Sequence, residues 1–563
     1  MLSHKILKIS QPCAIALQNS FAKELGISAI LSQVLINRGI KSIAEAEKFL
    51  NIKISQLFDP NKFSDMPKAV SLIKKAASCK DKVMIFGDYD VDGITAVALL
   101  ANTLRNLGLD TQHYLPHRVK EGYGLCKNIL QVTRERKIKL LITVDCGISN
   151  HKEIEELRRN NIEVIITDHH EPSGAEIPRA SAVLNPKVLG TNYPFRDLAG
   201  VGVAYKLCKA LSGSMLLDDL DLVCLGTIAD SVPLTGENRV IAKEGLRRLP
   251  QTKKAGLQIL MENAGIKDKK FTSTYVSFIL APRLNASGRM DTAEVSLNLL
   301  LSASRQQAIG LAGIIEGHNR QRQKVESRVL EEAEALINQE INFKQQKIIV
   351  LAKEGWHHGV LGIVASKIAD RFLRPAIVIS LNDGLCKGSG RSINNFHLFE
   401  ALLSCKQFLS GFGGHSHAVG LVITKDNIDG FKRSINKLAR EKLTLEDLLP
   451  ALDVDMELAL SDLNEGLIAE LERLEPFGKG NPEPLFFTRN LLLKGEVRSL
   501  GRQTLKFQVT DGKVVFQAIG FGMSSLRDSL LAAEKIDLVY FPRQDQWQGV
   551  SSLILEVKDI FFR

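Results

Sequence analysis

The stretch VMIFGDYDVDGITAVALL, residues 83–100, sets the fold class, because an apolar run leads into three aspartates at alternate positions and then into a second apolar pattern. The first run predicts a buried strand, and residues 94–106 predict a helix. The carboxylates of Asp88, Asp90 and Asp92 repel one another at close range, which costs stability unless a cation or a hydrogen-bond network compensates. The stretch therefore predicts a strand, a loop and a helix, with a positive partner among the aspartates.

The alternation of strand and helix patterns continues toward residue 170. Apolar strand patterns separated by helical patterns occur at residues 82–86, 111–116, 139–144 and 162–167. This order predicts an α/β fold with a mostly parallel sheet. Asp145 ends the third run, and Asp168, His169 and His170 end the fourth. Because ligands gather outside the carboxyl ends of parallel strands, we expect these groups to meet the first three aspartates at one sheet edge.

The remaining sequence predicts further domains. Residues 304–339 are polar and helix-favouring, so they predict a connecting helix about 50 Å long. A second α/β segment follows, with KIIVLA and PAIVIS as strands and KGSGRS and GFGGHSHAVG as glycine-rich turns. After the prolines and glycines of LEPFGKGNPEPLF, short alternating strands predict a small β barrel of the OB type. The expected boundaries are 1–55 for an N-terminal helical segment covering an edge of the next domain, 56–300 for the catalytic α/β domain, 301–340 for the connecting helix, 341–440 for the second α/β domain, and 441–563 for the linker and barrel.

Composition limits the class of protein. A chain of 563 residues has room for about three or four domains, and 45% hydrophobic with 24% charged residues excludes a disordered or fibrous protein. No apolar run approaches the ~20 residues of a membrane helix, and Lys and Gln interrupt the N-terminal segment, so we expect neither a membrane span nor a cleaved signal. Eight scattered cysteines without a CxxC pair predict a cytoplasmic protein. The net charge of +10 fits a polyanionic partner and an ordinary basic protein equally well.

Aspartates and histidines without a thiolate suit Mg²⁺ or Mn²⁺ better than a structural zinc ion. Two ions ~3.5 to 4 Å apart could clamp a phosphoryl group and lower the pKa of the attacking water, with Asp145 placed to bridge them. Each motif also has a structural alternative, since alternating aspartates occur in solvated loops, Asp92 fits a helix N-cap, and His169 and His170 fit polar surface. The joint occurrence of the motifs on successive units of one sheet favours a metal centre.

Several motifs carry a resemblance to a known family. GDYDVDG, TVDCG, TDHHEP and GTIADSVPL resemble the four motifs of the DHH phosphoesterases. YLPHRVKEGYGL, GVGVAYKL, PRLNASGRM, WHHGVLGIVASKI, KGSGRS, FGGHSHAVG and LEPFGKGNPEPLF narrow the resemblance to the RecJ family, the single-strand-specific 5′ to 3′ DNA exonucleases of bacteria. The resemblance extends from about residue 27 to residue 560. It implies a DHH-type parallel-sheet domain, a long linker helix, a DHH-associated α/β domain and an OB-like barrel.

The resemblance also implies a ligand set for two divalent cations, Mg²⁺ or Mn²⁺. One ion would be held by Asp92, Asp145, His169 and Asp230, and the other by Asp88, Asp90 and Asp145. Asp168 would orient its neighbours from outside the ligand set, and His170 would face the scissile phosphate. More distant members carry a metal-binding histidine at the position of Phe86, so the ligand set near Asp88 departs from theirs.

Substrate recognition is implied by the same resemblance. The residues expected to bind the nucleic acid and its 5′ end are Arg118, Arg283, Arg289, Ser389, Arg391 and His415. Glycine-rich backbone and arginine suit such an anion pocket. His417 departs from the family pattern, in which a small or apolar residue stands at this position. The implied product is a nucleoside 5′-monophosphate released during DNA repair and recombination. The implied partners of the monomeric enzyme are single-stranded DNA, a single-strand-binding protein and a helicase.

Two other functions are compatible with the motifs. A DHH phosphodiesterase for short oligonucleotides or cyclic dinucleotides would not need the third domain, and a non-catalytic DNA-binding scaffold would not need the acids that are all present here.

In the barrel region, aromatic residues alternate with basic ones: Phe507, Phe516, Phe521, Tyr540 and Trp547 with Lys494, Arg498, Arg502, Lys506 and Arg543. We expect most of the aromatics to fill the barrel core and the basic residues to contact a nucleic-acid backbone.

Overall fold

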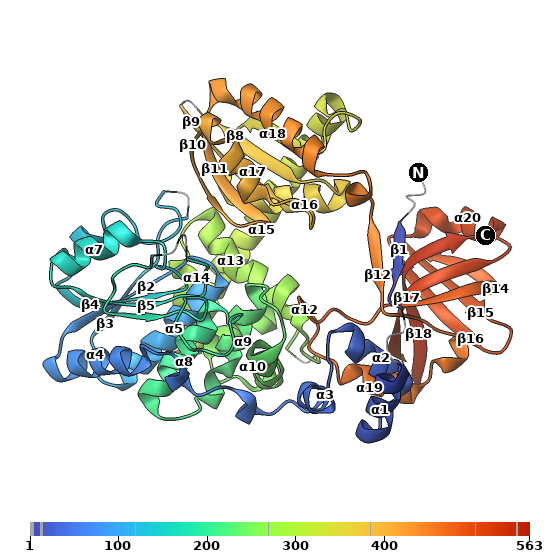
Figure 1. The fold of residues 1–563 in the computed structure, drawn as a ribbon, viewed down its shortest axis with the longest axis horizontal. Coiled ribbons are helices and arrows are strands. Elements are labelled where there is room, and N and C mark those ends of the chain that lie inside the picture. The colour runs from blue at the N-terminus through green and yellow to red at the C-terminus, as the bar shows by residue number, and fades with distance from the viewer. Residues whose placement is uncertain are drawn as a thin grey trace. The chain divides into compact units, whose positions relative to one another are not determined.

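The computed structural model describes residues 5–11, 15–118, 120–172, 174, 176–267, 269–382, 384–501, 503–547 and 550–563. The chain divides into two compact units, drawn in Figure 1. The α/β unit comprises Leu57–Val232 and Glu244–Leu449, and the barrel unit comprises Met1–Gln56, Pro233–Lys243 and Pro450–Arg563. Within the described ranges, no helix is long and apolar enough to cross a bilayer.

The first sheet of the α/β unit is entirely parallel, with the strand order β3-β2-β4-β5-β6. Its strands are β2 (Lys82–Gly87), β3 (Thr111–Tyr114), β4 (Ile138–Val144), β5 (Glu163–Thr167) and β6 (Ala182–Leu184). The helices between and beside them are α4 (Met66–Cys79), α5 (Val91–Asn106), α6 (Ile129–Glu135), α7 (His151–Arg159) and α8 (Gly200–Ser212). This arrangement confirms the predicted α/β class, because the strands and helices follow the alternating apolar patterns.

The turn from β2 into α5 is shaped by one aspartate and two glycines. Asp90 caps α5, since its side chain accepts hydrogen bonds from the amides of Asp92 and Gly93 at 3.0 and 3.2 Å. The helix therefore begins at Val91, ahead of the expected residue 94. A Cβ on Gly93 would lie 2.4 Å from the carbonyl oxygen of Asp88, and one on Gly87 would lie 2.2 Å from the Val97 side chain. Glycine at both positions lets the aspartate loop fold back tightly on the helix.

A helical layer and the predicted connecting helix follow. The main helices of the α/β unit after the sheet are α9 (Leu220–Ala229), α11 (Ala255–Asn263), α13 (Ala281–Met290) and α14 (Glu294–Leu300), while α10 (Gly236–Arg248) begins in the segment Pro233–Lys243 of the barrel unit. Helix α15 then runs from Arg305 to Glu340, with the Ser304 side chain as its N-cap. This 36-residue helix confirms the prediction from residues 304–339.

The second sheet of the α/β unit has the order β10-β11-β9-β8-β7, in which only the β7–β8 pair is parallel. Its strands are β7 (Ile349–Glu354), β8 (Ala376–Leu381), β9 (Leu385–Arg391), β10 (Leu409–Gly414) and β11 (Ala418–Thr424). The helices of this domain are α16 (Leu361–Phe372), α17 (Leu398–Ser404) and α18 (Ile428–Lys442). The prediction that KGSGRS forms a turn was wrong, because its residues up to Arg391 lie in β9, whereas GFGGHSHAVG does contain a turn, at residues 415–417 between β10 and β11.

Close packing explains why glycines occupy a central strand. A Cβ on Gly390 would lie 2.8 Å from Val419, 2.9 Å from Leu398 and 3.1 Å from Ile377. One face of β9 therefore packs its backbone directly against the core, while Ser389 and Arg391 project from the other face. Glycine here lets the backbone of β9 lie close to neighbouring side chains. The sequence pattern alone does not distinguish this use of glycine from its use in a turn.

The barrel unit is built around β14 (Phe486–Leu500), β15 (Thr504–Thr510), β16 (Val515–Phe521), β17 (Ile536–Trp547) and β18 (Val550–Phe562). These strands follow the order β14-β15-β16-β18-β17, and β17 pairs back with β14 to close the barrel. The closed five-strand order confirms the predicted OB-like barrel. Its strands are longer than the short ones expected, with β14 reaching 15 residues.

The N-terminal helices belong to the barrel unit. Helices α1 (Ile15–Leu25), α2 (Ala29–Asn37) and α3 (Ile43–Leu50) contribute Phe21, Leu31 and Leu50, respectively, to one hydrophobic core with the barrel residues Phe486 and Leu538. Strand β1 (Ile6–Ile9) pairs in parallel with β12 (Ala451–Val454). The expectation that these helices cover an edge of the catalytic domain was therefore wrong. Amphipathic helices need an apolar partner, but their sequence does not specify which one.

Replacing Gly390 with alanine should destabilise the chain by about 1–3 kcal/mol, because the added methyl group overpacks the core against Val419 and Leu398. Gly420→Ala is the matched control, since a Cβ at this strand position meets no atom within 4 Å. Urea unfolding of both variants measures the difference. Equal stability of the two variants would contradict the close-packing explanation.

Candidate metal centre

Acidic and imidazole side chains converge at the carboxyl ends of β2, β4 and β5. Asp88 and Asp90 follow β2, Asp145 follows β4, and His169 and His170 follow β5, while Asp230 caps the C-terminus of α9. Their ligand atoms form three overlapping groups within 4.8 Å: Asp88 with Asp90 and Asp145, Asp92 with His169 and Asp230, and Asp145 with His169 and His170. The fold thus brings together the side chains that follow separate strands, and Asp145 belongs to two of the groups.

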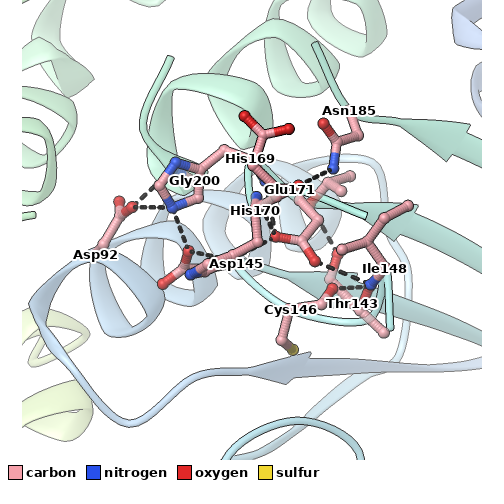
Figure 2. Close-up of polar contacts among 12 residues, drawn as sticks. Asp92, Thr143, Asp145, Cys146, Ile148, His169, His170, Glu171, Asn185 and Gly200 are labelled. Carbon is pink, nitrogen blue, oxygen red and sulfur yellow. Dashed lines mark hydrogen bonds and ion pairs between the residues drawn. The ribbon is translucent and has the colours of Figure 1, made fainter. Parts of the chain in front are cut away.

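The ring of His169 lies between carboxylates, as Figure 2 shows for Asp92 and Asp145. Its Nε2 atom is 3.2 Å from an oxygen of Asp145, 3.6 Å from Asp230 and 3.9 Å from Asp92. Within the described part of the chain, Nε2 of His169, Oδ1 of Asp88 and Oδ1 of Asp145 are buried and make no well-formed hydrogen bond, although Nε2 and the Asp145 oxygen lie 3.2 Å apart. Buried polar atoms are normally paired, so these unpaired oxygen and nitrogen atoms fit a divalent cation such as Mg²⁺ or Mn²⁺.

The raised pKa values of the aspartates also fit a cation site. Burial, with Asp90 nearby, raises the pKa of Asp88 to about 8 and that of Asp92 to about 7. Burial and Asp92 raise the pKa of Asp145 and Asp230 well above the usual value. Neutral carboxyls would relieve the repulsion without a cation, whereas a bound cation would keep them ionised. Burial and His170 lower the pKa of His169 to about 3, which leaves its imidazole in the neutral form that binds metals.

Asp92 and Asp145 are held in place from the start of α8. The amides of Gly200 and Val201 donate to the Asp92 carboxylate at 2.6 and 2.8 Å, as helix N-termini commonly do for anions. A Cβ on Gly200 would lie 2.5 Å from Oδ1 of Asp145, so only glycine fits beside this carboxylate. Asp145 itself has a positive φ of 60°. Such a left-handed conformation in a non-glycine residue marks a position fixed by its surroundings.

Asp168 belongs to none of the ligand groups and instead organises the loop after β5. Its carboxylate accepts hydrogen bonds from the amides of Ile148, His169 and His170, at 2.9, 2.7 and 3.1 Å. Although burial opposes ionisation, the neighbouring His170 and these amides lower the pKa of Asp168 to about 2. The ring of His170 lies 2.8 Å from the same carboxylate. This geometry fits the orienting role that was predicted for Asp168.

The surroundings of His170 favour its protonated form. Although burial lowers the pKa of this imidazole, the Asp168 carboxylate raises it to about 9. Its Nδ1 atom is also 2.9 Å from the hydroxyl of Tyr123, which the site prediction did not include. The ring of His415 stacks on His170 with centroids 5.9 Å apart. His415 therefore lies at the site through its contact with His170.

Positive side chains gather beside Asp88 and Asp90, and we call Arg118, Arg289 and Arg391 the arginine group. Burial and the charges of Arg118 and Arg391 lower the pKa of Arg289 well below its usual value. Burial and Arg118 likewise lower the pKa of Arg391. A Cβ on Gly362 would lie 3.0 Å from the Arg391 guanidinium and 3.1 Å from the Ser389 hydroxyl. Crowded guanidinium groups of this kind are stabilised by a bound anion.

Arg283 and Arg322 differ from the prediction of which arginines bind the nucleic acid. The guanidinium of Arg283 pairs with Glu316 at 2.7 Å and with the carbonyl of Ile279 at 2.9 Å, so its charge is already compensated. Arg322 of α15 instead lies among the neighbours whose charge acts on Arg289, and it pairs with Glu326. The sequence signal for Arg322 is weak, because basic and polar residues dominate the whole HNRQRQ stretch.

Phe86 does not contribute a ligand. It is a fully buried residue of β2 and stacks on Tyr114, with centroids 5.4 Å apart. An apolar ring therefore fills the position that carries a histidine in distant DHH proteins, and the group near Asp88 consists of carboxylates alone.

In the barrel unit, the aromatic and basic residues singled out in the sequence differ in how exposed their side chains are and in whether they are paired. Phe507 and Tyr540 are buried in the core, whereas Phe521 is 63% exposed. Arg498 and Lys506 lie directly opposite each other on β14 and β15. Arg543 pairs with Glu483 and Glu556, which neutralise it. Arg502 and the side chain of Trp547 lie outside the described part of the chain.

Without divalent ions, the melting temperature should fall as the pH rises from about 6.5 to about 8.5. The raised pKa of Asp88, about 8, means that the folded chain keeps a proton that an ordinary carboxyl of pKa 3.8 has lost, so unfolding becomes easier as the pH rises. His170, with a pKa of about 9, acts in the same direction. Thermal melts in EDTA and in Mn²⁺ measure the effect, which Mn²⁺ should abolish and Asp88→Asn should reduce. A flat profile in EDTA would contradict the assignment.

Matches to family models cover three parts of the chain: the N-terminal domain of the DHH family at residues 82–227, the DHHA1 domain at 345–441 and the RecJ OB domain at 454–559. The single-stranded-DNA-specific exonuclease RecJ of Bacillus subtilis (strain 168) is 39% identical over 544 residues, which cover 96% of this chain and 69% of that protein. The three matched regions follow the order predicted from the motifs.

Solved structures agree with the sequence relatives. RecJ from Thermus thermophilus in complex with Mn²⁺ superposes with a TM-score of 0.87 at 29% identity, covering 100% of this chain and 80% of that one. The complex of RecJ from the same organism with Mg²⁺ gives a TM-score of 0.79 at 27% identity, covering 99% of this chain and 78% of that one. The sequence identity and the shared fold together show that this chain belongs to the RecJ family.

Proposed function

We propose that this chain is a metal-dependent exonuclease that degrades single-stranded DNA from its 5′ end and releases nucleoside 5′-monophosphates. The observation that carries the proposal is that the arginine group lies close enough to the carboxylate groups for their charges to interact, Arg118 with Asp88 and Arg289 with Asp90. One set of side chains is suited to cations, and the other is suited to a phosphate. The names of the relatives, which are single-stranded-DNA-specific exonucleases, support the same substrate.

The ligands for two divalent cations would come from six residues: Asp92, Asp145, His169 and Asp230 for one ion, and Asp88, Asp90 and Asp145 for the other. Such cations lower the pKa of an attacking water and neutralise charge on the phosphoryl oxygens. The solved RecJ structures were obtained in complex with Mn²⁺ or Mg²⁺, and the oxygen-rich ligand groups suit both.

We assign His170 the role of acting on the scissile phosphate. Asp168 lies 2.8 Å from its ring and favours its protonated form, in which His170 could donate a hydrogen bond to a phosphoryl oxygen or to the leaving group. His415 stacks against this ring and limits its rotation. The two histidines would therefore orient the phosphodiester without acting as nucleophiles.

The arginine group gives a physical basis for selecting the 5′ end. A terminal phosphate carries up to two negative charges, whereas an internal phosphodiester carries one. The guanidinium of Arg391, with the Ser389 hydroxyl 3.3 Å away, offers several donors to such a group. Charge-assisted hydrogen bonds of this type contribute about 1.5–3 kcal/mol each, which is enough to prefer a chain end over the middle of a strand.

A DHH phosphodiesterase for short oligonucleotides is the second candidate function. The barrel favours the exonuclease, since OB barrels bind single strands and the matched model is the RecJ OB domain. Arg498 and Lys506, opposite each other on β14 and β15, are the residues that we expect to contact the DNA backbone, although Arg498 also pairs with Glu496 at 2.9 Å. The ligand groups are complete, which argues against a non-catalytic scaffold.

Replacing Asp145 with alanine should abolish hydrolysis and leave affinity for single-stranded DNA nearly unchanged, because Asp145 is in both proposed ligand sets while binding depends on basic residues. The assay compares 5′-labelled and 3′-labelled strands in Mg²⁺ or Mn²⁺ and follows product size with time. The wild type should release labelled mononucleotides at once from the 5′ end only. Turnover of Asp145→Ala within about tenfold of wild type would remove this residue from the centre.

Arg391→Ala should lower kcat/KM on 5′-phosphorylated strands by roughly tenfold or more and nearly equalise them with 5′-hydroxyl strands, since one charged contact to the terminal phosphate is lost. Arg283→Ala is the matched control, and it should leave the ratio between the two substrates unchanged because Glu316 already compensates Arg283. An unchanged ratio in Arg391→Ala would mean that this arginine only supports its strand.

A further inference from the structure

Arg118 is held differently from the other two members of the arginine group. The guanidinium of Arg289 donates to the carbonyl of Gly359 at 3.1 Å. That of Arg391 donates to the carbonyl of Gly390 at 2.8 Å. With the described residues, the guanidinium of Arg118 forms neither a hydrogen bond nor an ion pair. The placement of Arg118 must therefore depend on a contact of another kind.

The ring of Tyr89 supplies this contact. Cζ of Arg118 lies over the ring, 4.7 Å from its centroid. Strands β2 and β3 pair in parallel, so the loops that follow them leave the sheet at the same edge. Tyr89 lies on the first of these loops and Arg118 on the second. Because a cation is attracted to the face of an aromatic ring, such stacking can hold a guanidinium that has no carboxylate partner.

The backbone of Tyr89 is packed closely against α13. A Cβ on Gly288 would lie 3.0 Å from the carbonyl oxygen of Tyr89, and Gly288 directly precedes Arg289. On the other side, Asp90 caps α5 with its side chain. The ring of Tyr89 therefore projects from a backbone that is fixed on two sides.

Stacking leaves the hydrogen-bonding edge of the Arg118 guanidinium free. A guanidinium carries its N–H donors around its planar edge, whereas an aromatic ring covers only its face. Burial and the charge of Arg118 lower the pKa of Arg289 and Arg391, and the same charge acts on Asp88. Arg118 thus lies close to the other two arginines and to an acidic residue of the metal centre, with donors available to an anion.

We propose that Tyr89 is a positioning residue for Arg118. Its ring holds the guanidinium beside the metal centre and leaves the N–H donors to the 5′-terminal phosphate. This inference rests on the proposed role of the arginine group in binding the 5′ end. The hydroxyl of Tyr89 makes no hydrogen bond with the described residues, so the aromatic face is the part of the side chain that acts.

The ratio of kcat/KM on 5′-phosphorylated strands to kcat/KM on 5′-hydroxyl strands tests the proposal. Tyr89→Leu should lower this ratio by about fivefold, a typical effect for a partly buried cation–π contact, whereas Tyr89→Phe should keep it because the ring remains. Arg118→Ala should also lower the ratio. In that background Tyr89→Leu should lower it no further, since the two residues act through one contact.

Tyr275→Leu is the matched control. The ring of Tyr275 also carries a cation, with Nζ of Lys269 5.9 Å from its centroid, but this pair is not part of the arginine group. The ratio should therefore stay at the wild-type value in Tyr275→Leu. An equal fall in Tyr275→Leu and Tyr89→Leu would overturn the inference.

Binding of Mn²⁺ to the full chain without DNA, measured by electron paramagnetic resonance, separates the positioning of Arg118 from damage to the neighbouring ligands. Tyr89→Leu should bind Mn²⁺ as tightly as the wild type. An unchanged substrate ratio in Tyr89→Leu would overturn the inference, as would an equal fall in Tyr89→Phe or a further fall in the combined variant. An unchanged ratio in Arg118→Ala would instead overturn the proposed role of Arg118 at the 5′ end.

Should Tyr89→Leu lose Mn²⁺ binding or fail to fold, a ring-fluorinated phenylalanine at position 89 provides the test. Fluorine withdraws electrons from the ring face and weakens its attraction for a cation, while the shape of the ring is kept. The substrate ratio should then fall below that of Tyr89→Phe. Equal ratios in these two variants would overturn the inference.

Discussion

The mutual repulsion of buried carboxylates governs how the metal-binding edge is organised. Asp88, Asp92, Asp145 and Asp230 all have raised pKa values because they are removed from water and lie near one another. The amides at the start of α8, the glycine beside Asp145 and the hydrogen bonds to Asp168 hold these groups in positions that they would not adopt freely. The fold thus maintains an unfavourable electrostatic arrangement that a cation relieves.

The arginine group presents the opposite problem at the same site. Burial and the charge of Arg118 lower the pKa of Arg289 and Arg391, while Asp90 acts in the opposite direction on Arg289. Cations bound by the carboxylates and a phosphate bound by the arginines would balance both sets of charge together. Cations alone would leave the arginine charges uncompensated, and a phosphate alone would leave the carboxylate charges uncompensated. This is a physical reason for metal and nucleotide to stabilise each other's binding.

Much of the site could be predicted because its signals are local. An apolar run followed by Asp88, by Asp145 or by Asp168 places each acid at a strand end, and parallel strands bring such ends together. The glycines of β9 were predicted as a turn, since glycine also permits close packing, as at Gly390, and the pattern does not separate the two uses. The N-terminal helices were assigned to the wrong neighbour, because an apolar helix face such as that of Leu31 fits any core of suitable shape.

Patterns of neighbouring residues were sufficient to predict the parallel sheet, the order of the strand-end acids, the long connecting helix and the OB-like barrel. They did not show which arginines face the acids, a choice that follows from the folded arrangement, with Arg283 paired to Glu316 and Arg322 near Arg289. Nor did they show that Arg239 holds carbonyls that lie 234 to 237 positions further along the chain. Local periodicity sets backbone conformation, but the partner of a long charged side chain depends on which distant segments the fold brings within reach.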